Sequence, residues 1–189
     1  MVANSPVTAR HVGGSMRVVD LCHATMTTSD NAAANLLLPL IGSFSGFNAF
    51  LRALGDGTTR LDRTEPHLNE GKPGDPRDTT TPDAMLHATR AMLFGTALSP
   101  RSRARLIGWL VANTTGATRL RAGLPRGWRV GDKTGAGETG ANDVGVLWPG
   151  AGRKPILVAS YLTESRAEPS VMYAAHADVA RAIAAAVVG

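Results

Sequence analysis

The 189-residue sequence is long enough for one domain of ordinary size or for two small ones, since domains commonly contain roughly 100–200 residues. Hydrophobic residues make up 43% of the chain and charged residues 19%, which excludes a disordered or membrane-embedded composition and indicates a folded globular protein. The net charge of +5 does not indicate a nucleic-acid partner, because no DNA- or RNA-binding pattern accompanies the scattered basic residues, which are densest at Arg101, Arg103 and Arg105.

The first residues, Met1 to Pro6, lack the basic and apolar regions of a secretory signal, so we expect no signal peptide in this chain. No apolar run approaches the roughly 20 residues that span a bilayer, which predicts no membrane span. Cys22 is the only cysteine, which excludes an internal disulfide and a cysteine-based zinc site. A small buried hydrophobe is the simplest interpretation of Cys22.

Helical patterns fill the first third of the chain. Apolar spacing after Ser15 predicts a helix that ends near Thr27, and the apolar run 32–38 predicts a second helix, ended by Pro39. A further stripe over 47–54 stops at Gly55. Residues 55–80 have no sustained apolar period, and a loop of that length in a compact domain is usually functional.

The pattern changes from helices to strands in the second half. Thr81-Pro82 and Ser99-Pro100 are typical helix starts, for helices over about 82–93 and 100–110. Strand candidates follow at 128–133, 144–148 and 156–162, close enough for antiparallel pairing, and an alanine-rich helix is expected over 169–188. This order predicts an α+β fold, with a helical subdomain over 1–113 and an α/β subdomain over 114–189.

Three short motifs occur in one order: Ser29-Asp30-Asn31, Glu65-Pro66-His67-Leu68-Asn69 and Lys133-Thr134-Gly135. A three-position match arises by chance in roughly 4% of chains this long, but all three together in roughly one in ten thousand. Each motif alone has an ordinary structural explanation. Ser29 and Asn31 suit helix capping, Glu65 suits a solvated loop, and Lys133 suits an exposed strand edge.

Taken together, the three motifs resemble those of class A serine β-lactamases. The similarity extends along the chain, through Ser5-Pro6-Val7-Thr8, Asn35-Leu36-Leu37, Arg60-Leu61-Asp62-Arg63 and Asp132-Lys133-Thr134-Gly135-Ala136-Gly137. The resemblance implies the serine β-lactamase/transpeptidase-like fold, an antiparallel sheet flanked by helices beside a mainly helical subdomain. Penicillin-binding transpeptidases share this fold and the Lys-Thr-Gly motif but lack the glutamate, so Glu65 points to turnover of the acyl-enzyme.

The resemblance also implies a role for each motif in opening a β-lactam ring, with no cofactor and no metal. Ser29 would relay a proton to the ring nitrogen, and Glu65 would be the general base for the deacylating water. The resemblance implies further contacts of Asn31 with the substrate amide and of Asn69 with the water. It places Lys133, Thr134 and Gly135 along the strand that faces the substrate carboxylate, and the backbone N–H of Ala136 in the oxyanion hole.

Three further features are expected by the same resemblance. Arg119 would bind the substrate carboxylate, although Arg121 is close enough in sequence to take that role instead. Arg63 and Asp78 would form an ion pair that closes the long loop. Within the loop, the Glu65-Pro66 peptide is expected to be cis, since X-Pro bonds are the ones that adopt this form.

The chain departs from the family at the nucleophile. Its lysines are Lys72, Lys133 and Lys154, and none stands three residues after a serine, so no Ser-x-x-Lys motif is present. We interpret the sequence as an N-terminally truncated part of a β-lactamase that is inactive alone. The complete protein is expected to be a monomer that acts on β-lactam antibiotics in the periplasm or outside the cell. A non-catalytic remnant that binds β-lactams or peptidoglycan weakly is the main alternative.

Overall fold

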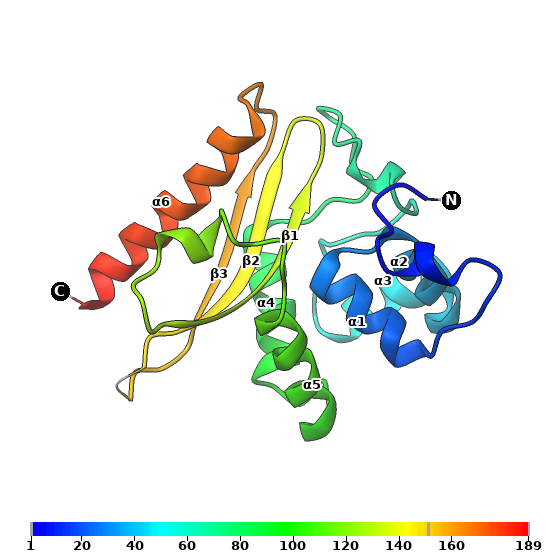
Figure 1. The fold of residues 1–189 in the computed structure, drawn as a ribbon, viewed down its shortest axis with the longest axis horizontal. Helices are drawn as coiled ribbons and strands as arrows, with labels where there is room; N and C mark the ends of the chain where they lie inside the picture. Colours follow the sequence, from blue (N-terminus) through cyan, green and yellow to red (C-terminus); the bar gives the residue numbers. More distant parts are fainter. Residues whose placement is uncertain (1, 151, 189) are drawn as a thin grey trace.

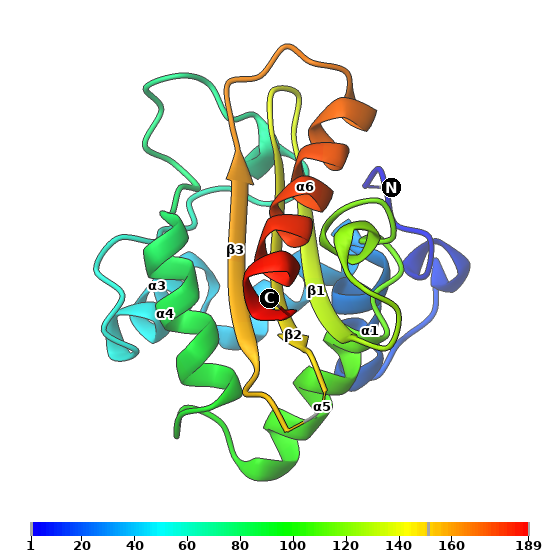
Figure 2. The ribbon, with the colours of Figure 1, turned by 90° about the vertical axis from the view of Figure 1, so that its left-hand side faces the viewer.

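The computed structural model describes residues 2–150 and 152–188 and confirms an α+β fold (Figure 1). A sheet of three antiparallel strands occupies the centre, and helices cover both of its faces (Figures 1 and 2). The helices α1, α2 and α3 form a separate cluster beside the sheet, reached from it by long connections. The proposed boundary between subdomains near residue 113 remains a prediction.

The strands are β1 (Arg129–Ala136), β2 (Ala141–Trp148) and β3 (Ile156–Leu162), in the sheet order β1-β2-β3. The first two extend beyond the predicted ranges at the end where they meet. Lys133 pairs with Val144 in the β1–β2 register, and Ala136 pairs with Ala141 next to the connecting turn. Because β1 is an edge strand of the sheet that residues 2–150 and 152–188 form, one side of the Lys-Thr-Gly segment has no strand partner there.

The N-terminal helices are η1 (Thr8–His11), α1 (Val18–Thr28), α2 (Asn31–Leu37), η2 (Leu38–Ile41) and α3 (Ser43–Ala53). Helix α1 begins later than the sequence predicts, because Arg17 rather than Ser15 is at the N-cap and no side chain caps it. Leu21, Ala24 and Ala33 form the small core between α1 and α2. Several apolar side chains of this part remain exposed: Val12, Val18, Leu36, Leu40 and Ile41.

Helices α4 (Pro82–Leu93) and α5 (Pro100–Val111) begin where the sequence predicts. Thr81 accepts a hydrogen bond from the N–H of Ala84, and Ser99 accepts one from the N–H of Ser102, so both N-caps are filled. Both helices pack on one face of the sheet, α4 against β3 and α5 against β1.

Helix α6 (Pro169–Val188) crosses the opposite face of the sheet (Figure 2). Together with η4 (Leu120–Gly123) it covers a core of buried residues: Leu120, Val130, Leu147, Val158 and Ala180. On the α5 face, Leu93, Leu110 and Val146 form a second core. Burial of each large side chain contributes about 1.5–3 kcal/mol, so the two cores fix the sheet between its helices.

The long segment between α3 and α4 contains a single short helix, η3 (His67–Asn69), as the lack of apolar period predicts. The Arg63 Nε atom lies 2.5 Å from Asp78 Oδ2, in the ion pair that the resemblance implies. The other Asp78 oxygen accepts the backbone N–H groups of Asp62 and Arg63. The pair therefore joins the two ends of the loop.

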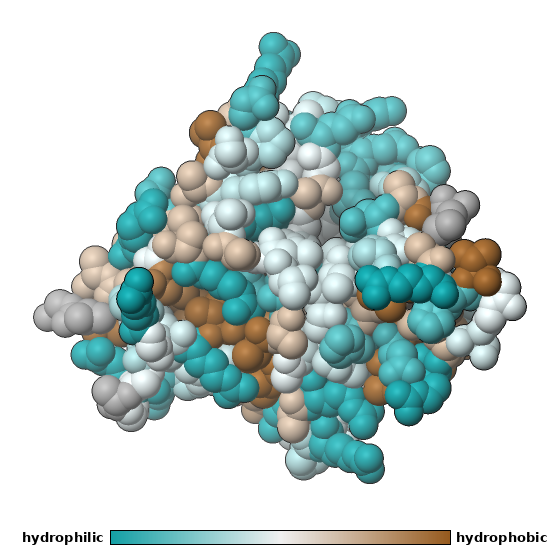
Figure 3. All heavy atoms as spheres, viewed as in Figure 1, coloured by the Kyte–Doolittle hydropathy of each residue, from teal (hydrophilic) through white to brown (hydrophobic). Residues whose placement is uncertain are grey.

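On the face shown in Figure 3, hydrophilic atoms predominate and hydrophobic atoms form smaller patches. Among residues 2–150 and 152–188, no single helix has the length and composition needed to cross a membrane. Only the segments Asn31–Ile41 and Ser43–Ala53, counted together across a 76° bend, reach those limits.

Candidate active site

The Ser-Asp-Asn motif lies at the junction between α1 and α2. Ser29 has a φ of 55°, in the left-handed region, and its backbone N–H closes the end of α1 on Ala24 O. Asp30 caps α2 by accepting the N–H of Ala33 at 2.9 Å. Capping thus explains Asp30 but not the Ser29 hydroxyl, which is left for another partner.

Asp30 also holds the N-terminal segment against this junction. It is fully buried and accepts the backbone N–H groups of Val7 and Thr8, each at 2.9 Å, and the Thr8 hydroxyl at 2.8 Å. Beside it, the Asn31 amide nitrogen donates to Ala3 O at 3.0 Å. Asn31 is therefore oriented by the first residues of the chain.

Lys133 connects this junction to the sheet. Its Nζ atom donates to Ser29 Oγ at 2.9 Å and to Thr134 O at 2.7 Å. Burial lowers the pKa of Lys133, and the negative charge of Glu65 opposes that shift. The structure thus brings together three residues from the three motifs, although Ser29 and Lys133 are 104 positions apart.

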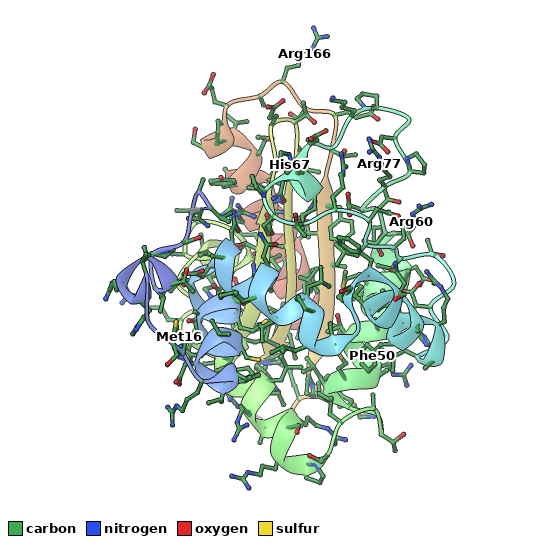
Figure 4. The ribbon with its side chains drawn as sticks, turned by 90° about the vertical axis from the view of Figure 1, so that its right-hand side faces the viewer. Met16, Phe50, Arg60, His67, Arg77 and Arg166 are labelled. Carbon is green, nitrogen blue, oxygen red and sulfur yellow. The ribbon has the colours of Figure 1, made fainter. Side chains whose placement is uncertain are left out.

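Glu65 lies in the long loop, which passes in front of the sheet near His67 in Figure 4. Its Oε2 atom accepts the Asn69 amide at 2.6 Å. Burial raises the pKa of the Glu65 carboxyl above its ordinary value, while Asn69 and Lys133 lower it. The Glu65-Pro66 peptide is cis, as the resemblance implies.

Asn35 holds the backbone of Glu65, a contact that the sequence analysis did not assign. The Asn35 amide donates to Glu65 O at 2.9 Å, and Asn35 Oδ1 accepts the Glu65 N–H at 2.9 Å. This two-point contact fixes the loop against α2. The only signal in the sequence is that Asn35 lies in one of the segments that resemble the family.

The remaining Lys-Thr-Gly residues follow Lys133 along β1. Thr134 is buried, and its hydroxyl lies 2.6 Å from the hydroxyl of Thr115, another residue that the sequence analysis did not single out. Gly135 O accepts a hydrogen bond from Arg119. Ala136 is the last residue of β1 and is exposed.

The contacts of Arg119 and Arg121 differ in kind. Arg121 pairs with the buried carboxylate of Asp132, at 2.6 Å from Nη2 to Oδ1. Arg119 is 4% exposed and its Nη1 atom donates only to carbonyl oxygens, those of Gly135 and Asn142 at 2.6 and 2.5 Å. Its guanidinium also lies 4.2 Å from the ring centroid of Tyr173. Arg121 thus forms an ion pair with a carboxylate, whereas Arg119 forms none with the residues that the structure describes.

An apolar cavity of about 440 Å³ opens beside Lys133, Thr134 and Gly135. It lies between the sheet and the helices α1, α4 and α5. Its lining includes Met26, Met85, Met92, Leu106, Leu110 and Val144. The cavity therefore has a polar end, formed by the Lys-Thr-Gly motif, and an apolar body.

Comparison with known proteins gives one consistent result. A profile described as the β-lactamase enzyme family (Beta-lactamase2) matches residues 2–188. The β-lactamase FAR-1 of Nocardia farcinica is 53% identical over 171 residues, which is 90% of this chain and 54% of the relative. The β-lactamase AST-1 of Nocardia asteroides is 54% identical over 172 residues, 89% of this chain and 55% of the relative. The chain thus spans about half the length of these curated relatives.

Solved structures agree with the sequence comparison. A structure titled "Ancestral (GNCA) Beta-lactamase class A" superposes with a TM-score of 0.95 at 56% identity, covering 98% of this chain and 72% of that one. A β-lactamase from Xanthomonas campestris superposes with a TM-score of 0.96 at 49% identity, covering 100% of this chain and 70% of that one. The fold, the shared motifs and these similarities show that the chain belongs to the class A β-lactamase family.

Proposed function

We propose that residues 1–189 form the larger part of an active site that hydrolyses the amide bond of penicillins and cephalosporins through a serine acyl-enzyme. The observation that carries this proposal is the hydrogen bond from Lys133 Nζ to Ser29 Oγ, with the Glu65 carboxylate close enough to affect the pKa of Lys133. In this proposal hydrolysis also requires a nucleophilic serine, and no Ser-x-x-Lys motif occurs in the 189 residues.

Glu65 is proposed as the general base for deacylation. A carboxylate that accepts a proton from water works best when its pKa is raised toward the working pH, and burial supplies that shift here. Asn69, bound to the same carboxylate at 2.6 Å, is proposed as the second group that holds the attacking water. Asn35 would keep the loop backbone in place during the reaction.

Ser29 and Lys133 are proposed to deliver a proton to the departing ring nitrogen. When the nucleophile adds to the carbonyl carbon and the C–N bond breaks, the nitrogen needs a proton. The Ser29 hydroxyl would donate its proton to the nitrogen and take another from Lys133, to which it is hydrogen-bonded. The lowered pKa of Lys133 favours this transfer.

The remaining groups are proposed to bind the substrate. Lys133, Thr134 and the charge of Arg119 form a cationic, hydrogen-bonding edge that suits a carboxylate. The Ala136 N–H would donate to the developing oxyanion, beside Gly135 on the same strand. Asn31 is proposed to contact the side-chain amide of the substrate.

The apolar cavity beside Lys133 is proposed as the seat of the helix that carries the nucleophile. Its apolar lining suits the buried face of a helix, and its polar end lies at the Lys-Thr-Gly motif, where a nucleophile is needed. In the complete protein, which we propose to be an exported monomer, this helix would place its Ser-x-x-Lys motif beside Ser29.

The experiment compares three purified proteins: residues 1–189 alone, the same chain preceded by the N-terminal segment of AST-1, and that fusion with the nucleophilic serine of the segment replaced by alanine. Hydrolysis of a chromogenic cephalosporin is followed with each. We expect hydrolysis by the intact fusion only, since loss of the nucleophile in a serine hydrolase costs about 10⁶-fold in turnover. Enzyme-level turnover by residues 1–189 alone, or by the alanine fusion, contradicts the proposal. A folded but inactive intact fusion points instead to a non-catalytic remnant.

A further inference from the structure

Two fully buried aspartates face each other across β1 and β2. Asp132 and Asp143 each have an exposed fraction of 0%. In the register, Asp132 is opposite Gly145 and Asp143 is opposite Thr134, so the two aspartates are diagonal neighbours on one face of the sheet. Because Gly145 has no side chain, Asp132 can pack over it, with its Cβ atom 3.5 Å from the position that a Cβ atom of residue 145 would take. Cβ atoms of diagonal neighbours are about 7 Å apart or less, within reach of two carboxyl side chains.

One oxygen of Asp132 is well satisfied and the other is not. Oδ1 accepts Nε and Nη2 of Arg121, at 2.9 and 2.6 Å, and the Asn113 amide at 3.0 Å. Oδ2 is buried and has no donor in the described part of the chain. Gly116 packs so closely on it that a Cβ atom at that position would lie 1.8 Å from Oδ2.

Asp143 likewise has one carboxyl oxygen with a hydrogen-bond donor and one without. Its Oδ2 atom accepts the backbone N–H of Leu120 at 3.1 Å. Its Oδ1 atom is buried, and no donor for it exists within residues 2–150 and 152–188. A buried carboxylate oxygen without a donor costs several kcal/mol, so two of them on facing residues indicate a missing proton.

The charged and titratable groups around Asp143 support this. They are Asp132 on β1, Arg119 and Arg121 at η4 and His176 on α6, with Lys133 acting from the other face of β1. The Tyr161 side chain on β3 lies on the opposite face, because Ser160 and not Tyr161 pairs with Asp143. Burial, followed by the negative charge of Asp132, raises the pKa of Asp143 to about 7, against the opposing effect of the two arginines. Burial also lowers the pKa of His176, so it adds no positive charge at neutral pH.

We propose that Asp132 and Asp143 share one proton between their two donor-free oxygens, so that the pair carries a single negative charge. Arg121 neutralises that charge through its ion pair with Asp132. Arg119 and Lys133 are consequently not needed to balance the aspartates, and their positive charges can attract the anionic group of a substrate. The aspartates are thus positioning residues for the cationic edge of the site, a role that rests on the substrate binding proposed above.

The shared proton is tested by NMR titration of ¹³C-labelled aspartate carboxyl groups in the unmodified chain. We expect one aspartate signal to titrate near pH 7, and to be missing in Asp143→Asn. Asp178→Asn, the same substitution at an exposed site on α6, is the control and should keep that signal. If every aspartate titrates below about pH 5, no proton is shared and the proposal is wrong.

Stability provides a second measurement. The pKa of Asp143 is about 7 in the folded chain, above the 3.8 of a free aspartate. The contribution of Asp143 to the stability of the fold is therefore fully present at low pH and is lost as the pH rises from about 4 to about 7. Since each pKa unit is tenfold, the ratio of folded to unfolded chain should fall by up to about a thousandfold over this range. In Asp143→Asn that fall should disappear, and an unchanged fall would overturn the proposal.

The positioning role is tested in the fusion with the AST-1 segment. Above pH 7 a second negative charge beside Arg119 and Lys133 should raise KM for a cephalosporin, and in Asp143→Asn this rise should be absent while the Asp178→Asn control retains it. A KM independent of pH in the unmodified fusion overturns the positioning role. The carboxyl titration is measured without substrate, so it stands or fails independently of hydrolysis.

Discussion

The ion pair between Arg63 and Asp78 gives a quantitative prediction about the long loop. The side chains are 13% and 2% exposed, and Arg63 Nε lies 2.5 Å from Asp78 Oδ2. Asp78→Asn removes the charge but keeps a carbonyl oxygen for the N–H groups of Asp62 and Arg63. Asparagine also tolerates the φ of 57° at this position better than alanine.

The expected loss of stability follows from the contacts that remain. Breaking a buried ion pair costs about 3–5 kcal/mol, but Arg63 retains Glu70 at 3.0 Å and Asp75 at 3.8 Å. We therefore expect Asp78→Asn to reduce the free energy of unfolding by about 2–3 kcal/mol, the value of a hydrogen bond between charged groups. For a chain of this size the melting temperature should fall by about 4–12 °C.

Thermal unfolding followed by circular dichroism measures this change, with limited proteolysis to locate cleavage within residues 55–80. Asp20→Asn is the matched control, because it breaks the exposed pair with Arg17 and should leave the melting temperature unchanged. If Asp78→Asn melts within 2 °C of the unmodified chain, as the control should, the pair does not hold the loop and the reasoning fails.

Two further predictions concern the completed fusion. Arg119→Ala should lower kcat/KM about ten- to a hundredfold, because it removes a charged contact worth about 1.5–3 kcal/mol. Arg121→Ala should chiefly lower the melting temperature, because it breaks the ion pair with Asp132. Equal kcat/KM values in Arg119→Ala and in the unmodified fusion would contradict this assignment. The rate of deacylation should fall at low pH as Glu65 is protonated, and this fall should begin at a higher pH than for an ordinary glutamate because the pKa of Glu65 is raised. At high pH, kcat/KM should fall as Lys133 loses its proton, at a pH below the ordinary lysine pKa of 10.5. Pre-steady-state rates from pH 4 to 10 check both limbs, and a pH-independent rate would refute both assignments.

The sequence predicts helix starts best where the signal is local. Thr81-Pro82 and Ser99-Pro100 place α4 and α5 correctly, because an N-cap hydroxyl and a proline act within a single turn. Ser15 is a misleading signal of the same kind. Its helix begins at Val18 instead, and nothing in the adjacent residues distinguishes the two starts.

Strand ends depend on tertiary pairing and are predicted less well. Gly135 and Ala136 have low strand propensity, yet they extend β1 because Asn142 and Ala141 pair with them across the turn. Only the register, which combines two distant segments, defines this end of the sheet. The buried aspartates on these strands were likewise not expected, since charged residues are rarely fully buried unless paired.

In the candidate site, too, the sequence indicates features that depend on local motifs and misses those that depend on tertiary packing. The three motifs indicate which residues belong to it, and the hydrogen bond from Lys133 to Ser29 brings two of those motifs together. The sequence left Arg119 and Arg121 as alternatives, because two positions along the chain do not separate them. Their different partners, carbonyl oxygens for Arg119 and a carboxylate for Arg121, depend on the packing of η4 against the sheet.

Intact-protein mass spectrometry shows whether these residues supply the deacylation machinery for a serine nucleophile. The AST-1 fusion carrying Glu65→Ala is mixed with a penicillin, beside the unmodified fusion and the fusion whose nucleophilic serine is alanine. We expect a stable mass increase of one penicillin in Glu65→Ala only, because the serine is acylated and no base activates the water that removes the acyl group. An absent adduct in Glu65→Ala, or an equally stable adduct on the unmodified fusion, would contradict it.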